Sequence, residues 1–283
     1  MKKANTSPNS AEVPAPAISF DRKKLIAQRE NIWYPELARE KLLTRLHDIA
    51  TDPERRRPRS LAIIAEPNGG KSSIMERYQE LHPAYDGLEG RIIPSIMVNM
   101  TGVMRVSDLS TALLEAIGAI KPEDGTHPAR MKRFVSLAKK AQLGPIFLDE
   151  FHDCVDAQGR GLAFLRLVKG LLNVGLMVVP AGVEEMEEVI RSDRQLLLRF
   201  NLSLGRLNQI RNRGEVRLLL KKMIEPHELQ LTDQAATFIL KSTKGVFGVV
   251  LDLLEETLLE QGSISLAALM EQGPLTSGVH PVS

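Results

Sequence analysis

Cysteine is almost absent from this sequence of 283 residues, which contains only Cys154. A single cysteine excludes an internal disulfide and suits a reducing compartment. Its position just after an apolar run favours a small packing residue over a catalytic thiol. The first ten residues contain no apolar segment of the kind that a secretory signal requires, so we expect a cytoplasmic protein.

Long apolar runs are also missing. The longest stretch without a charged residue, 170–183, has 14 residues and contains Gly175 and Pro180. A helix needs about 20 apolar residues to cross a bilayer, so we expect a soluble protein with no membrane partner.

The net charge of +2 is too small to indicate a nucleic-acid-binding chain, so the distribution of charge matters more than its sum. The length allows one α/β core of roughly 200 residues and a small second domain.

One short segment carries the strongest chemical signal. Residues 65–72, with the sequence AEPNGGKS, lie between an apolar run at 61–64 and a helical pattern at 74–81. A strand, a glycine-containing loop and a helix together form a phosphate-binding P-loop, in which backbone N–H groups and the helix N-terminus face phosphate oxygens. Lys71 would reach the β and γ phosphates of ATP, and the Ser72 hydroxyl would bind Mg²⁺. The expected cofactor-binding residues are Asn68, Gly69, Gly70, Lys71, Ser72 and Ser73.

The motif departs from the usual pattern at its first position, where Ala65 stands in place of glycine. Alanine adds only one methyl group, so we expect the loop to form. Because Gly-Lys-Ser also occurs by chance in loops, a second motif is needed to support the assignment.

That second motif is the apolar run at 146–148, which ends in Asp149 and Glu150. Alone, such a run is more often a strand that ends in solvent. Paired with a P-loop it matches the Walker B strand, which we expect beside the P-loop strand, with Asp149 on Mg²⁺ and Glu150 polarising the attacking water. The two motifs together predict an ATPase.

Alternating helical and strand patterns predict a parallel sheet covered on both faces. The predicted strands are 91–99, 146–150 and 175–181 in addition to 61–64. The predicted helices of this part lie in 20–59, 74–81, 106–120, 129–141, 161–172 and 184–199. Three amphipathic helices follow at 215–224, 233–241 and 249–261, the last with Leu251, Leu254 and Leu258 as its buried stripe.

The predicted domains follow from this order. They are a disordered arm at 1–18, an α/β ATPase domain at 19–204, a helical lid at 205–272 and a flexible tail at 273–283. Trp33 and Tyr34, about 35 residues before the P-loop, are either a core plug or a wall for the adenine base.

This order of motifs resembles the TniB/TnsC family of AAA+ transposition regulators. The resemblance runs from about residue 32 to 259 and rests on IWYPELAREKL, EPNGGKSS, IFLDEFH, and VPAGVEE followed by DRQLLLRF. It implies an AAA+ P-loop fold with a C-terminal helical lid. It also implies ATP and Mg²⁺ as cofactors, a homo-oligomeric ring or filament on duplex DNA, and a link between a target-selector protein and a transposase.

Carried over by position, the resemblance assigns Lys71, Ser72 and Asp149 to phosphate and magnesium, and Glu150 to water activation. Arg199 matches the arginine finger that reaches the γ-phosphate of a neighbouring subunit, and Arg191 and Arg194 compete for that role.

Two polar groups common in AAA+ proteins are missing. Val183 stands where a polar sensor is expected, and the segment 245–249 lacks an arginine. We therefore expect slow hydrolysis, with the nucleotide used as a switch.

Basic residues gather at 55–59, 130–140 and 206–222, and a solvated surface is the ordinary explanation of such runs. DNA-facing surfaces of ring ATPases favour Arg105, Arg130, Lys132 and Arg133. No aromatic platform accompanies them, so we expect contact with the duplex backbone and no stacking on single strands.

Two other functions fit the motifs less well. One is a helicase-loader-like AAA+ ATPase, and the other is a nucleotide-gated scaffold without DNA binding.

Overall fold

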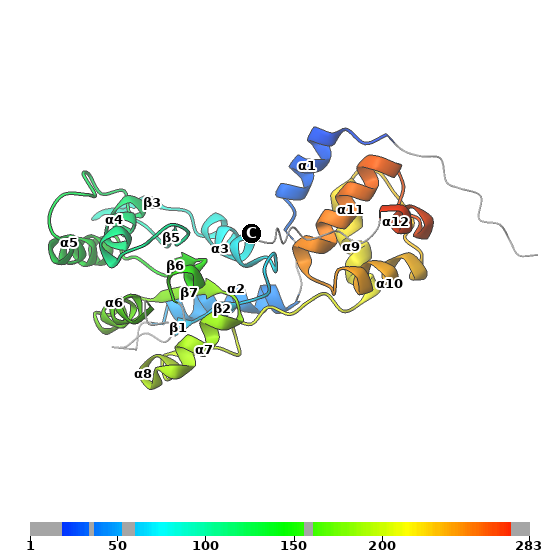
Figure 1. The fold of residues 1–283 in the computed structure, drawn as a ribbon. Coiled ribbons are helices and arrows are strands. Elements are labelled where there is room, and N and C mark those ends of the chain that lie inside the picture. The colour runs from blue at the N-terminus through cyan, green and yellow to red at the C-terminus, as the bar shows by residue number, and fades with distance from the viewer. Residues whose placement is uncertain (1–18, 34–36, 53–59, 156–160, 273–283) are drawn as a thin grey trace, which may run out of the picture. The chain divides into compact units, whose positions relative to one another are not determined.

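The computed structural model describes residues 19–33, 37–52, 60–155 and 161–272. The predicted arm at 1–18, the tail at 273–283, Tyr34 and the basic run at 55–59 lie outside these ranges or within their gaps. The described chain divides into two compact units (Figure 1). Of the described residues, the α/β unit comprises those within 33–209 and 246–248, and the helical unit comprises 19–32, 210–245 and 249–272.

A parallel sheet forms the centre of the α/β unit. Its four-stranded part has the order β2 (Ile63–Ile64), β7 (Val178–Gly182), β6 (Ile146–Asp149) and β5 (Ile96–Asn99). The short strand β1 (Ser60–Leu61) precedes β2 and pairs in parallel with β8 (Phe200–Asn201). The chain after β8 continues along β2, because Ile64 bonds through its backbone to Gly205 and Leu207. This confirms the predicted α/β fold with a parallel sheet.

The strand order corrects one expectation. β7 lies between β2 and β6, so the Walker B strand is not the direct neighbour of the P-loop strand. The sequence shows which segments are strands, but the order of parallel strands depends on crossover connections that no local pattern encodes.

Helices cover the sheet, and their buried faces form its two apolar layers. They are α2 (Leu37–Ala50), α3 (Lys71–Leu81), α4 (Val106–Ala116), α5 (His127–Lys140), α6 (Gly161–Asn173), α7 (Glu184–Ser192) and α8 (Arg194–Leu197). Phe134, Leu148 and Phe164 are buried in one layer, and Leu46, Ile74 and Phe147 in the other. A 3₁₀ turn, η1 (Phe151–Cys154), follows the Walker B strand.

Two predicted elements in this unit are each divided. The predicted strand 91–99 is split, because β4 (Gly90–Ile92) pairs with β3 (Tyr85–Gly87) in a hairpin and Pro94 precedes β5. The predicted helix 184–199 ends at Ser192. Asp193 begins a new helix there by accepting hydrogen bonds from the backbone of Gln195 and Leu196, at 3.0 and 3.2 Å.

The helical unit contains α1 (Arg22–Glu30), α9 (Arg213–Ile224), α10 (Asp233–Ser242), α11 (Phe247–Gln261) and α12 (Leu266–Gln272). α11 starts in the α/β unit and continues in the helical one. Leu251, Leu254 and Leu258 are buried, as predicted. Helix α12 was not predicted, since it has only seven residues.

Helix α1 belongs to the helical unit, whereas the sequence-based boundary placed residues 19–32 in the α/β domain. The physical reason is an ion-pair cluster between distant parts of the chain. Arg29 forms ion pairs with Asp252 and with Glu255, the latter at 3.1 Å. A short amphipathic helix carries no sequence signal for which domain it joins.

Across the part of the chain that the structure describes, no helix is both long and apolar enough to cross a membrane.

Candidate functional site

The loop between β2 and α3 is a closed turn built on two glycines. The Gly69 N–H donates to the Glu66 carbonyl over 2.9 Å. A Cβ on Gly69 would lie 2.7 Å from the Ala65 Cβ, so Ala65 is accommodated because its neighbour lacks a side chain. Gly70 has φ +83°, in the left-handed region that favours glycine, and α3 begins directly after it. The P-loop therefore forms although its first glycine is replaced.

Ser72 and Asp149 are in direct contact at the first turn of α3. The Ser72 hydroxyl donates to Asp149 Oδ2 over 2.7 Å, and Asp149 Oδ1 accepts the Glu150 N–H over 2.9 Å. Lys71 is buried beside them, with 4% of its surface exposed, and Asp149 is exposed to 6%. A hydroxyl and a carboxylate are hard oxygen ligands of the kind that Mg²⁺ prefers, so the residues present fit this ion.

Glu150 adopts a left-handed backbone conformation, with φ 51° and ψ 38°. This conformation is uncommon for a residue with a side chain, and such strain often marks functional positions. The Glu150 carboxylate lies 3.2 Å from His152 Nδ1, a contact without hydrogen-bond geometry that becomes an ion pair when the imidazole is protonated. Gly182 at the end of β7 leaves the space for this ring, since a Cβ there would lie 3.2 Å from the same nitrogen.

His152 was not predicted as a site residue, although it ends the IFLDEFH segment. The two-residue spacing between Glu150 and His152 predicts a contact between their side chains only when the 3₁₀ turn after the strand is known.

A second residue that the sequence analysis missed is Arg39 of α2. Its side chain is buried, and its guanidinium donates to the Gly69 carbonyl over 3.0 Å. The same group lies 4.2 Å from the centre of the Phe247 ring. Arginine at a helix position normally indicates a solvated face, so no sequence pattern predicts this contact.

Trp33, one of the two residues considered for the adenine wall, lies at the edge of the core layer that contains Ile74. Its indole Nε1 donates to Glu40 over 2.8 Å, and the Arg77 guanidinium lies 5.7 Å from its ring centre. The contact with Arg77, a residue of α3, places Trp33 beside the P-loop helix. Tyr34 falls outside the described residues.

Arg199, the residue matched to the arginine finger, contacts the end of α6 in its own chain. Its guanidinium donates to the Leu172 carbonyl over 3.3 Å and to Asn173 Oδ1 over 2.7 Å. Arg199 and Arg191 both line a surface pocket of about 530 Å³. The Arg191 guanidinium forms an ion pair with Glu187.

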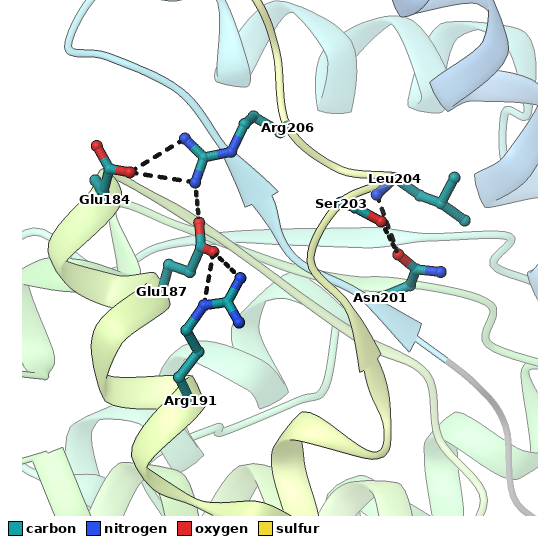
Figure 2. A network of polar contacts seen from close by, with 7 residues as sticks. All are labelled: Glu184, Glu187, Arg191, Asn201, Ser203, Leu204 and Arg206. Atoms are coloured by element: carbon teal, nitrogen blue, oxygen red, sulfur yellow. Dashed lines mark hydrogen bonds and ion pairs between the residues drawn. The ribbon is translucent and has the colours of Figure 1, made fainter.

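Residues 201–207, which run beside the P-loop strand β2, are held by a charged network (Figure 2). Arg206 forms ion pairs with Glu184, at 3.3 Å, and with Glu187, both in the first turn of α7. Glu187 also accepts from Arg191, at 2.5 Å, and its side chain is only 8% exposed. On the same segment, Asn201 Oδ1 accepts from the Leu204 N–H over 3.1 Å and fixes the turn after β8.

The expected DNA-binding residues differ in their surroundings. Lys132 and Arg105 are exposed. Arg130 donates to the Glu123 carbonyl over 3.2 Å, and Arg133 donates to the Lys121 carbonyl over 2.8 Å. Both arginines therefore hold the loop that precedes α5.

The basic run at 206–222 is engaged in ion pairs at several positions. Arg213 lies 2.9 Å from Asp233, and Arg217 pairs with the same carboxylate. These contacts hold the pKa of Asp233 below its usual value, through the hydrogen bond from Arg217 and the charge of Arg213.

Cys154, the last residue of η1, is buried, and its burial raises the pKa of the thiol to about 11. A thiol with so high a pKa is protonated near neutral pH and is a poor nucleophile.

Comparison with known proteins identifies the family. The family described as bacterial TniB protein matches residues 22–206, which is more than half of the chain. Among the curated proteins, no significant match is found.

Solved structures with this fold include ORC and Cdc6 proteins. The ORC2 protein of Aeropyrum pernix, in ADPNP–ADP complexes, has a TM-score of 0.62 and 14% identity over 89% of this chain and 71% of its own. The ORC1 protein of the same organism, in complex with DNA, has a TM-score of 0.59 and 16% identity over 88% and 68%. Cdc6p of Pyrobaculum aerophilum has a TM-score of 0.60 and 14% identity over 88% and 69%.

These similarities show an AAA+ P-loop fold with a helical C-terminal region, as predicted. The match of the family model carries the assignment further than fold: the chain belongs to the TniB family.

Proposed function

We propose that this chain is an ATPase that regulates DNA transposition. In its ATP-bound form it oligomerises on duplex DNA and connects a target-selector protein with a transposase. The observation that carries the proposal is the Ser72–Asp149 contact of 2.7 Å at the start of a P-loop helix, in a chain of the TniB family. The contact matters because it brings the P-loop residue and the Walker B residue together at one place in the fold.

The P-loop supplies the contacts for nucleotide phosphates. Backbone N–H groups at the start of α3 and the Lys71 ammonium would hold the phosphate chain. Ser72 and Asp149 would hold Mg²⁺, which neutralises charge on the phosphate oxygens. The burial of Lys71 and Asp149 strengthens these electrostatic interactions, because little water screens them.

Glu150 is the proposed carboxylate base that orients and polarises the attacking water. His152 Nδ1 lies 3.2 Å from its carboxylate and would orient that side chain as an ion-pair partner when the imidazole is protonated. Val183 caps α7 at the position of the expected polar sensor and offers no side-chain hydrogen bond. Slow hydrolysis follows from this absence, and an ATP-bound assembly would then persist.

Subunit assembly is assigned to Arg199, with Arg191 and Arg194 as the competing candidates. In the single chain the Arg199 guanidinium donates to Asn173 on α6. To act on a neighbouring nucleotide it would exchange these contacts for phosphate oxygens, which form stronger, charge-assisted hydrogen bonds.

Duplex DNA binding is assigned to Arg105 and Lys132, which are exposed, with Arg130 and Arg133 in supporting positions. The A. pernix ORC1 structure, a protein of the same fold, is a complex with DNA. Phe134, beside Arg133, is buried and offers no surface for stacking, so these basic residues favour contacts with the phosphate backbone over base readout.

The direct test is electron microscopy of the full chain with duplex DNA and a non-hydrolysable ATP analogue. We expect rings or filaments on the duplex that disappear without nucleotide. Assemblies that form with ATP but without DNA would favour the nucleotide-gated scaffold. If the chain loads a replicative helicase and does not stimulate a transposase, the helicase-loader function would be favoured.

A further inference from the structure

The Arg39 guanidinium contacts the backbone carbonyl groups of the P-loop. Nη2 donates to the Gly69 carbonyl over 3.0 Å, and Nη1 lies 3.3 Å from Ser73 Oγ and 3.5 Å from the Gly70 carbonyl. The Ser73 hydroxyl itself donates to the Gly70 carbonyl over 2.8 Å. One buried guanidinium thus fixes two consecutive peptide units of the loop, directly and through Ser73.

The orientation of those peptide units decides where the loop's donors point. A peptide bond is planar and trans, so its C=O and its N–H point in opposite directions. The Gly69 carbonyl shares its peptide unit with the Gly70 N–H, and the Gly70 carbonyl shares its unit with the Lys71 N–H. When Arg39 holds both carbonyls on one side, both N–H groups are directed to the other side, where a phosphate group would bind.

The loop is also constrained from the segment 246–248 of the same unit. The Phe247 ring lies 4.2 Å from the Arg39 guanidinium, in a cation–π arrangement. The Gly248 N–H donates to the Asn68 carbonyl over 2.8 Å. Gly70 leaves room for the guanidinium, because a Cβ there would lie 2.6 Å from Arg39 Nη2.

We infer that Arg39 is a positioning residue for the nucleotide phosphates. It preorganises the N–H groups of Gly70 and Lys71 and touches no substrate itself. Without it, binding would have to pay for ordering the loop, so affinity would fall while the number of sites stayed the same. This inference rests on the proposed function, since it concerns the same P-loop.

The test is titration calorimetry of the full chain with ATP and Mg²⁺. Arg39→Lys keeps the buried charge but loses the planar fork that binds two carbonyls at once, and Arg39→Gln also loses the charge. We expect both variants to bind ATP about tenfold or more weakly, with one site per chain as in the parent. Arg45→Lys, an exposed arginine of the same helix, is the matched control and should bind like the parent.

Phe247→Leu supplies a variant that leaves Arg39 in place and keeps an apolar side chain beneath it. We expect a loss of affinity of about threefold. If Arg39→Gln does not fold, Arg39→Lys and Phe247→Leu decide the question.

Three results are distinguishable. Unchanged dissociation constants in Arg39→Lys and Phe247→Leu would overturn the inference alone. A lower binding stoichiometry with an unchanged dissociation constant would also overturn it, because that pattern reports a smaller folded fraction. No ATP binding by the parent chain would overturn the proposed function, and this inference with it.

Discussion

The Ser72 hydroxyl donates a hydrogen bond of 2.7 Å to Asp149, a residue 77 positions later in the sequence. β7 separates their strands, so the contact is made across the top of the sheet and not between neighbouring strands. The hydroxyl belongs to the first turn of α3 and the carboxylate to the end of β6, which is how a βα loop reaches over the carboxyl edge of a parallel sheet.

Glu150→Gln should bind ATP as the parent does but hydrolyse it at least 10²-fold more slowly, because an amide cannot accept a proton from water. Phosphate release under saturating ATP measures the effect, and calorimetry checks the binding. Hydrolysis at the parental rate would show that Glu150 is not the activating acid.

His152→Ala tests the partner of that carboxylate. We expect a smaller loss of hydrolysis rate, about tenfold, since the Glu150 side chain remains but loses the group 3.2 Å from it. ATP affinity should not change. In the Glu150→Gln background, His152→Ala should reduce the hydrolysis rate little further. If the two losses of rate multiply in the double variant, the residues act independently and the proposed coupling is contradicted.

Arg199→Ala should leave ATP binding by the single chain nearly intact while weakening ATP-dependent assembly and hydrolysis, because the proposed contact crosses a subunit interface. The matched control is Asn173→Ala, which removes the 2.7 Å partner of Arg199 but keeps the guanidinium. If Arg199 only stabilises the end of α6, both variants should lose similar stability and both should still assemble.

A mixing experiment then tests action between subunits. Arg199→Ala and Glu150→Gln, each inactive alone, should recover part of the hydrolysis rate together, because a mixed interface can pair an intact acid with an intact arginine. Absence of recovery at every ratio, with co-assembly demonstrated, would contradict the assignment.

The sequence predicts the P-loop, the Walker B carboxylates and the class of fold because each depends on a local pattern with a fixed backbone consequence. The Ser72–Asp149 contact follows from two such patterns once a parallel sheet is assumed. Arg39 and His152 could not be found in the same way. The position of Arg39 depends on how α2 packs against the P-loop, and that of His152 on the turn after β6. Tertiary packing of this kind leaves no periodicity in the sequence.

Asp193 shows the same limit in the fold. A continuous helix over 184–199 fits the apolar spacing, but the Asp193 carboxylate bonds to the backbone of the next turn and ends α7. Its pKa is lowered below the usual 3.8, first by the hydrogen bond from Lys169 at 2.5 Å. A lowered carboxyl pKa contributes stability that is present above the unfolded value and lost as pH falls through the folded one.

Asp193→Asn should therefore reduce the free energy of unfolding at pH 7 by about 1 kcal/mol, a modest figure because the side chain is partly exposed. The difference between parent and variant should shrink as the pH is lowered below about 4. Denaturant unfolding at pH 7 and pH 3 measures it, and a difference that is equal at both pH values would contradict the assignment of the effect to the ionised carboxylate.

DNA binding should depend on ATP and on salt, with little sequence preference. If roughly three phosphates are neutralised per subunit, the logarithm of affinity should fall with the logarithm of salt concentration at a slope near −3 per subunit. Lys132→Glu should weaken binding to all duplexes alike and flatten this slope, without changing the fold. Arg133→Glu should also destabilise the loop before α5, because it loses the bond to the Lys121 carbonyl. Fluorescence anisotropy at several salt concentrations separates the two, and an unchanged slope for Lys132→Glu would remove that residue from the DNA surface.

The most direct test of the central claim, that this P-loop binds ATP, is calorimetric titration of the parent chain and of Lys71→Ala with ATP and Mg²⁺. The proposed charge-assisted contact of the Lys71 ammonium with phosphate would be worth about 2–3 kcal/mol, so its loss should weaken affinity by tens-fold or more. Lys41→Ala, an exposed lysine of α2, serves as the control and should bind like the parent. Equal affinity of the parent and Lys71→Ala, or no binding by the parent, would contradict the account.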